Sequence, residues 1–111
     1  MKEDSIFLKH ILEEIEKIEN SLSGVSEMKF KNNVDYVDMT VRRIEIIGEA
    51  AKNLSKSLVN GHPEVEWKKI IGTRDKIIHG YFDVSVKLIW EIVEKDIPEL
   101  KRHIKSILKE I

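Results

Sequence analysis

The chain has 111 residues, of which 41% are hydrophobic and 35% are charged, and its net charge at pH 7 is −1. This length and apolar content predict one globular domain spanning residues 1–111 and exclude a disordered chain. The small net charge gives no bulk positive field to hold nucleic acid non-specifically, and the absence of cysteine excludes disulfides, thiolate catalysis and cysteine-based zinc sites.

The N-terminus is charged, and no apolar run is longer than three residues. We therefore expect neither a signal peptide nor a membrane-spanning helix, and we expect a cytoplasmic protein with no membrane partner. No alternating strand pattern, internal repeat or low-complexity tract competes with a helical interpretation.

The first helix is predicted from apolar residues at spacings of three and four, namely Leu8, Ile11, Ile15, Ile18 and Leu22. Asp4 or Ser5 is placed to cap its N-terminus, and residues 20–24 are typical of a helix end. A short polar segment follows, in which we expect Met28 and Phe30 to cover one edge of the core.

A longer second helix is predicted next, with Asn32 or Asn33 as its N-terminal cap. Its apolar stripe is close to a coiled-coil repeat and comprises Val34, Val37, Val41, Ile44, Ile47, Ala51, Leu54 and Leu58. Residues 60–63 form the clearest break in the chain. Their proline suits the first turn of a third helix, which we expect to run to about His79 before a tight connection over residues 80–83.

The last helix is predicted from an apolar stripe of its own, which comprises Ile89, Val93, Ile97, Leu100, Ile104, Ile107 and Ile111. Pro98 lies inside this stripe and should kink the helix or divide it in two. Together these patterns predict an all-α protein, an up-and-down bundle of four or five helices.

The third predicted helix carries the candidate site. Arg74 lies on its apolar stripe, where a guanidinium must be paired, reach solvent at a cleft or face a partner, because an isolated buried charge is very costly. His79 is five residues further on, and Gly80 is placed to end the helix in a left-handed conformation. A turn there would let His79 and Tyr81 approach Arg74.

Arginine and histidine in one cleft would suit RNA cleavage without a metal ion, in which the ribose 2′-OH attacks the adjacent phosphate. Arg74 would stabilise the charge that develops on phosphorus, and His79 would act as acid or base near neutral pH. One histidine per chain is sparse for a step that needs both, so a two-fold dimer would supply the second. The alternative is purely structural: a buried Arg–Glu pair, a helix-ending His and a packed Tyr.

Two carboxylates on the second helix, Glu45 and Glu49, flank Gly48. Gly48 favours a close helix crossing, and it would also leave room for Arg74 to approach one of these carboxylates. The basic residues nearby are interpreted as a solvated face, with a phosphate groove as the alternative; they are Arg42, Arg43, Lys52, Lys68 and Lys69.

The four histidines show no metal-ligand spacing, so we expect no metal, and no motif predicts another cofactor. His10 and His103 are typical of a helix surface, and His62 belongs to a loop. Trp67 and Trp90 are interpreted as core residues, with a subunit interface as the alternative for Trp90.

At Arg74, Asp75, His79 and Tyr81 the chain resembles the HEPN superfamily, and specifically the HepT-like toxins, which carry Arg-x4-His-x-Tyr. The similarity extends over most of the chain: residues 10–13, 38–42, 44–51, 63–67, 70–71, 81, 84, 90–93 and 96–100 follow that family's pattern. The position after the arginine is often Asn in these toxins, whereas Asp75 adds a charge that repels phosphate unless it is paired.

This resemblance implies a homodimer with the Arg and His of both subunits in an interfacial cleft. It implies a metal-independent endoribonuclease, the toxin of a toxin–antitoxin pair, with RNA as substrate and Arg74 and His79 as catalytic residues. It also implies an MntA-like minimal nucleotidyltransferase as antitoxin, with Tyr81 as the candidate acceptor of AMP. Asp75, Glu45 and Glu49 would support the site.

A second hypothesis is a non-catalytic helical subunit that docks a nucleotidyltransferase and positions its substrate. The near-neutral charge and Asp75 motivate this hypothesis. It predicts a stable complex with the transferase, no RNA cleavage and no growth defect when the chain is expressed alone.

Overall fold

The computed structural model describes the backbone of residues 2–80 and 85–111 and the side chains of residues 3–73 and 85–111. Within these ranges every regular element is helical. In chain order they are α1 (Lys2–Ser21), α2 (Glu27–Lys31), α3 (Val34–Lys52), α4 (Lys56–Gly61), α5 (Trp67–Gly80), α6 (Val86–Glu91), the π-helical turn η2 (Ile92–Asp96) and α7 (Ile97–Glu110). The predicted all-α class is confirmed.

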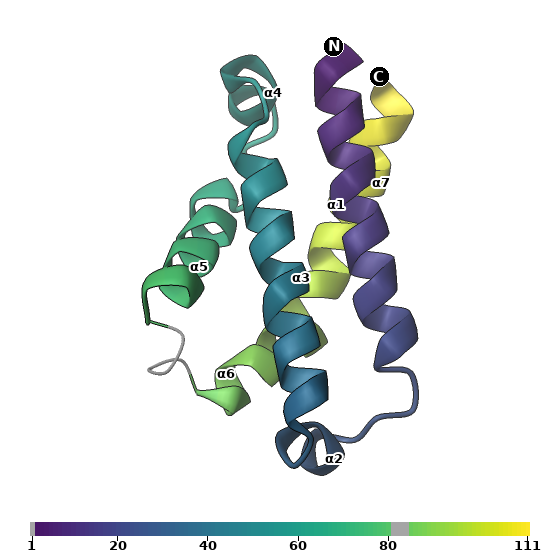
Figure 1. Cartoon of the computed structure of the whole chain (residues 1–111). Coiled ribbons are helices and arrows are strands. Elements are labelled where there is room, and N and C mark those ends of the chain that lie inside the picture. Colours follow the sequence, from purple (N-terminus) through teal and green to yellow (C-terminus); the bar gives the residue numbers. More distant parts are fainter. Residues whose placement is uncertain (1, 81–84) are drawn as a thin grey trace.

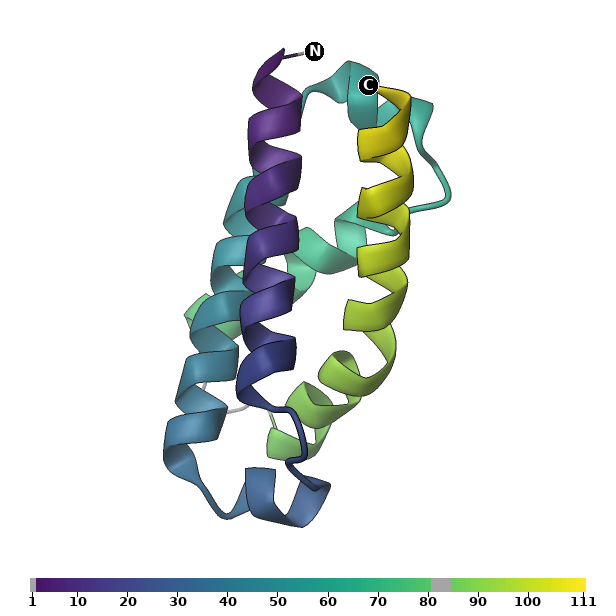
Figure 2. The same cartoon turned by 90° about the vertical axis from the view of Figure 1, so that its right-hand side faces the viewer.

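The helices form an up-and-down bundle. α3 packs against both α1 and α5, and α1 also packs against α7 (Figure 1). The two termini and α4 lie at one end of the bundle, whereas α2 and α6 lie at the other (Figure 2). α1, α3, α5 and the series α6–η2–α7 alternate in direction, as predicted. None of the helices in the described part of the chain is long and apolar enough to cross a lipid bilayer.

The core is built from the predicted apolar stripes. Every residue of the α1 stripe is buried, and Ile104 and Ile107 of α7 are buried against it. Phe30 is fully buried, and its ring centroid lies 5.1 Å from that of Trp90, which fastens α2 to α6. The core interpretation of Trp90 is thereby confirmed. Three apolar residues that were expected at the core are instead exposed: Met28 of the short segment, and Val34 and Ile111 of the apolar stripes.

The start of α1 differs from the prediction. The helix begins at Lys2, so Asp4 lies inside its first turn and does not cap it. The Asp4 side chain is buried and accepts hydrogen bonds from the backbone N–H of Ser55 at 2.9 Å and from its hydroxyl at 2.6 Å. A buried carboxylate needs such donors, and these two join the N-terminus to the turn before α4.

That turn interrupts the predicted second helix. Asn33 caps α3 as expected, accepting from the backbone N–H groups of residues 35 and 36, but α3 ends at Lys52. The side-chain amide of Asn53 donates to the carbonyl of Glu49, and Ser55 caps α4 through the N–H of Leu58. These side-chain hydrogen bonds to backbone groups compete with the regular hydrogen bonds of a helix, and the helix ends there. The predicted apolar stripe therefore crosses a break between α3 and α4.

α5 begins at Trp67, four residues later than the proline that was predicted to start it. Residues 62–66 fold into a turn in which the N–H of Val65 donates to the carbonyl of His62 at 3.2 Å. The indole N–H of Trp67 donates to the same carbonyl at 3.0 Å, and both Val65 and Trp67 are buried. Burial of these two side chains favours the turn over an earlier helix start.

The last helix is divided, as Pro98 predicted. The N–H of Ile97 donates to the carbonyl of Ile92, five residues back, which makes η2 a π-helical turn. Pro98 has no N–H to donate to a carbonyl in the preceding turn, and it lies in the first turn of α7. The wider turn redirects the chain between α6 and α7.

Candidate functional site

α5 supplies the backbone of the predicted site. It runs from Trp67 to Gly80, so the expected end near position 79 is confirmed to within one residue. The side chains of Arg74, Asp75 and His79 lie outside the described residues, and so does Tyr81. Their approach to one another therefore stays a prediction. Positions 74 and 79 share one continuous helix, and five residues correspond to about 140° around its axis.

The two predicted supporting carboxylates lie on α3, which packs against α5. Glu45 receives Arg42 Nη1 at 3.4 Å, an exposed pair one turn apart on the same helix. Glu49 is exposed, and Gly48 between them is buried, as a close helix crossing requires. Their proposed approach to Arg74 is not decided by these contacts.

The basic residues on α3 and α5 are not one solvated face. Arg43 is about two-thirds buried, and its guanidinium reaches Glu14 on α1 at 3.0 Å. The Glu14 side chain is only 4% exposed and also receives Lys17 at 3.2 Å. This pair joins α1 to α3, so the interpretation of Arg43 as a surface or phosphate-groove residue was wrong. The spacing of residues within one helix could not reveal a partner 29 positions away.

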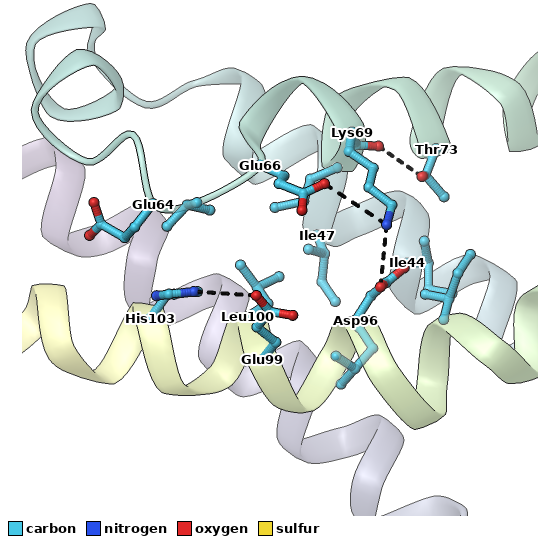
Figure 3. Close-up of a pocket in the computed structure, with 14 residues that line it drawn as sticks. Ile44, Ile47, Glu64, Glu66, Lys69, Thr73, Asp96, Glu99, Leu100 and His103 are labelled. Carbon is cyan, nitrogen blue, oxygen red and sulfur yellow. Dashed lines mark hydrogen bonds and ion pairs between the residues drawn. The ribbon is translucent and has the colours of Figure 1, made fainter.

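Lys52, Lys68 and Lys69 are exposed, and the Lys69 ammonium is paired with two carboxylates. The Lys69 ammonium lies 3.9 Å from Glu66 and 3.5 Å from Asp96, which is on η2 (Figure 3). It therefore links α5 to the turn that precedes α7.

The Lys69 contacts span a groove that the sequence did not predict. Its floor is aliphatic and comes from α3, α5, η2 and α7; it includes Ile44, Ile47, Ile70, Ile92, Ile97 and Leu100. Its rim is polar and comes from the two walls on either side: Glu64, Glu66 and Lys69 on one wall, Asp96, Glu99 and His103 on the other (Figure 3). The cavity volume is about 70 Å³.

Two histidines contact carboxylates on the rim of the groove. His103 lines the groove with its Nε2 3.7 Å from Glu99, so it is more than an ordinary surface residue. His62 lies in a loop, as expected, with Nδ1 3.1 Å from Glu64 and Nε2 3.5 Å from Glu110. A backbone hydrogen bond, and then the contact with His62, lower the pKa of the Glu64 carboxyl. His10 is exposed, as predicted.

Among the residues with described side chains, no three His, Asp or Glu groups are placed together to hold a metal ion.

The family model described as "Ribonuclease HepT-like" matches residues 11–107. This chain belongs to the HepT-like family. The match covers α2 to α6 entirely, most of α1 and α7, and the whole Arg-x4-His-x-Tyr motif. The family predicted from the motif and its surrounding pattern is confirmed.

Several relatives support this membership. "Putative RNase TTE0752" of Caldanaerobacter subterraneus subsp. tengcongensis is 44% identical over 98% of this chain and 97% of its own length. "Probable ribonuclease HepT" of Thermococcus cleftensis is 37% identical over 93% of this chain and 94% of its own. "Gamma-glutamylcyclotransferase and putative RNase MJ0434" of Methanocaldococcus jannaschii is 43% identical over 99% of this HepT-like chain, which spans 50% of that protein. No solved structure matches the chain.

Proposed function

We propose that this HepT-like chain is a metal-independent endoribonuclease whose Arg74 and His79 act in a cleft between two identical subunits. The observation that carries the proposal is the Arg-x4-His-x-Tyr motif inside a family match that spans residues 11–107. The names of the relatives support an RNase-type activity, and the helical α5 backbone supports a rigid platform for positions 74 and 79.

The proposed reaction needs one base, one acid and one cation. The base accepts the proton of the ribose 2′-OH as its oxygen attacks the adjacent phosphorus. Arg74 stabilises the negative charge that develops on the phosphoryl oxygens. The bond from phosphorus to the 5′ oxygen then breaks, and the acid protonates that oxygen, which leaves a 2′,3′-cyclic phosphate and a 5′-hydroxyl. Imidazole can act as either acid or base near neutral pH.

The proposed dimer solves two problems that a single subunit would have in catalysing this reaction. One chain supplies one motif histidine, whereas the reaction uses two proton-transfer groups. Positions 74 and 79 are also about 140° apart around the axis of α5, so a second subunit that faces the helix could combine its own residues with them. Two-fold symmetry would bring both pairs together and would concentrate positive charge where the phosphate binds.

The experiment that tests this activity is cleavage of a defined RNA by the purified chain in excess EDTA. We expect cleavage with cyclic-phosphate ends, which resist a phosphatase until acid or a cyclic phosphodiesterase opens them. Cleavage that stops in EDTA and returns with added Mg²⁺ would contradict the proposed chemistry. A chain that binds its partner but never cuts RNA would favour the non-catalytic docking subunit.

We further propose that the chain is the toxin of a toxin–antitoxin pair and that an MntA-like nucleotidyltransferase silences it by transferring AMP to Tyr81. Tyr81 is the motif tyrosine, two positions after His79. AMP attached at that position would place a bulky anion beside the phosphate-binding groups and exclude RNA.

The modification predicts that Tyr81→Phe abolishes incorporation of labelled AMP from ATP in the presence of the transferase, because phenylalanine lacks the acceptor oxygen. The matched control is Tyr36→Phe on α3, which removes the other tyrosine hydroxyl of the chain and should leave labelling unchanged. Label that reaches the Tyr81→Phe variant at wild-type stoichiometry would place the acceptor at another residue.

A further inference from the structure

The groove between α5 and the η2–α7 segment concentrates negative charge. Among the residues with described side chains, its rim carries four carboxylates, Glu64, Glu66, Asp96 and Glu99, against one ammonium, Lys69. With His103 neutral this rim has a net charge of −3, whereas the whole chain has a net charge of −1. The rest of the chain is therefore positive by comparison. RNA is repelled from this groove, and a cation is attracted to it.

The contacts of Lys69 show how a cation can bind between the two walls of the groove. Its ammonium lies between Glu66 on one wall and Asp96 on the other, 3.9 and 3.5 Å away (Figure 3). The distance between the walls therefore suits an ammonium or guanidinium group that contacts a carboxylate on each side. Charge-assisted contacts of this kind are among the stronger polar contacts in proteins.

The other end of the groove has the same acidic walls and no lysine or arginine among its lining residues. There Glu64 lies on one wall and Glu99 on the other, and they are paired with the imidazoles of His62 and His103, respectively. An imidazole balances a carboxylate only when it is protonated. A backbone hydrogen bond, and then the contact with His62, lower the pKa of the Glu64 carboxyl, which favours its charged form. The Glu64–Glu99 end of the groove can therefore bind a cation that belongs to another molecule.

Between the two ends the floor is aliphatic, and its cavity of about 70 Å³ has room for one small aliphatic side chain. Amphipathic helices bind grooves between helices through such an apolar anchor, with charged residues on either side of it. We propose that this groove docks a basic amphipathic helix of a partner protein, with an aliphatic side chain on the floor and Lys or Arg between Glu64 and Glu99. This inference does not depend on the proposed nuclease activity.

The test uses a short synthetic helix with Leu on one face and Lys on the others, together with a scrambled peptide of the same composition that cannot form an apolar face. Titration into isotopically labelled protein should shift the backbone amides of residues 64–73 and 96–103. The Glu64→Lys/Glu99→Lys variant should weaken binding at least about tenfold, and added salt should weaken binding to the wild type.

The matched control is Glu13→Lys/Glu16→Lys, which makes the same change in net charge at two exposed positions of α1 outside the groove. It should retain nearly wild-type affinity, and circular dichroism should show equal helicity for both variants. Equal binding of the scrambled peptide, amide shifts outside the groove, or equal losses in the two variants would overturn the proposal. Sedimentation that shows a second copy of the chain closing the groove, released by Glu64→Lys/Glu99→Lys, would also overturn it.

Discussion

Replacement of either Arg74 or His79 by Ala should abolish RNA cleavage by the purified chain. Loss of His79 removes a proton-transfer group, which typically contributes about 10² to 10⁴ in rate. Loss of Arg74 removes charge stabilisation at the phosphate, which contributes about 10² to 10³ where one donor has been deleted in other enzymes. Because a symmetric cleft loses both copies of the residue, we expect each variant to fall by at least about a thousandfold.

Cleavage of a fluorescent RNA under single-turnover conditions measures this loss. The matched control is His10→Ala, which removes an exposed imidazole on α1 and should retain wild-type activity. Expression in cells should follow the same order, with growth arrest and RNA degradation for wild type and His10→Ala and neither for the site variants. Cleavage by His79→Ala at the wild-type rate would exclude the assigned role.

Phe30→Ala should cause the largest loss of stability among single substitutions in the described core. The Phe30 side chain is fully buried and packs on Trp90 with a centroid distance of 5.1 Å. Truncation leaves a cavity and removes the contact between α2 and α6, which costs about 3–5 kcal/mol for a buried aromatic residue. For a domain with about 5–15 kcal/mol of total stability, this loss should lower Tm by more than about 10 °C.

Thermal and urea unfolding followed by circular dichroism measure that change. Met28→Ala is the matched control, because Met28 lies on the same short helix but is 74% exposed. It should change the free energy of unfolding by less than about 0.5 kcal/mol. Equal losses for the two variants would show that α2 contributes through its backbone alone and that the Phe30–Trp90 contact adds little.

The fold was predictable wherever local chemistry decides the structure. Apolar spacing found α1 and the core faces of α3 and α7, Asn33 identified the start of α3, and Pro98 identified the break before α7. Gly24 has a φ of +74°, so its position after α1 also follows from its conformational freedom. Each of these features depends on residues within about two turns of one another.

Two of the errors have the opposite cause, because they depend on partners far away in the sequence. Asp4 or Ser5 was assigned as a cap, but the Asp4 carboxylate accepts hydrogen bonds from Ser55, which is 51 residues away in the sequence. Arg43 was assigned to the surface, but it is paired with the buried Glu14 on another helix. A third error is local: residues 63–66 were assigned to a helix, but burial of Trp67 and its hydrogen bond to the His62 carbonyl favour a turn.

The candidate site, like the fold, was predictable only where residues close together in the sequence decide it. Its residue types and their placement on one helix followed from the sequence, and the family match covers them. The acidic groove beside α5 did not, because its walls come from segments about 30 residues apart that meet only after α7 packs against the bundle. The number of subunits in the proposed catalytic cleft likewise depends on association between chains, and it is decided by experiment.

The experiment that tests a shared cleft most directly is a measurement of RNA cleavage by mixed dimers. Two differently tagged copies can be expressed together and purified in tandem, to give dimers of one wild-type and one His79→Ala subunit, beside control dimers of wild type and His10→Ala. If one cleft uses the histidine of both subunits, the mixed His79→Ala dimer should be inactive and the control dimer fully active. A mixed dimer that retains about half of the wild-type activity, or a monomer that cleaves RNA, would contradict a shared catalytic cleft.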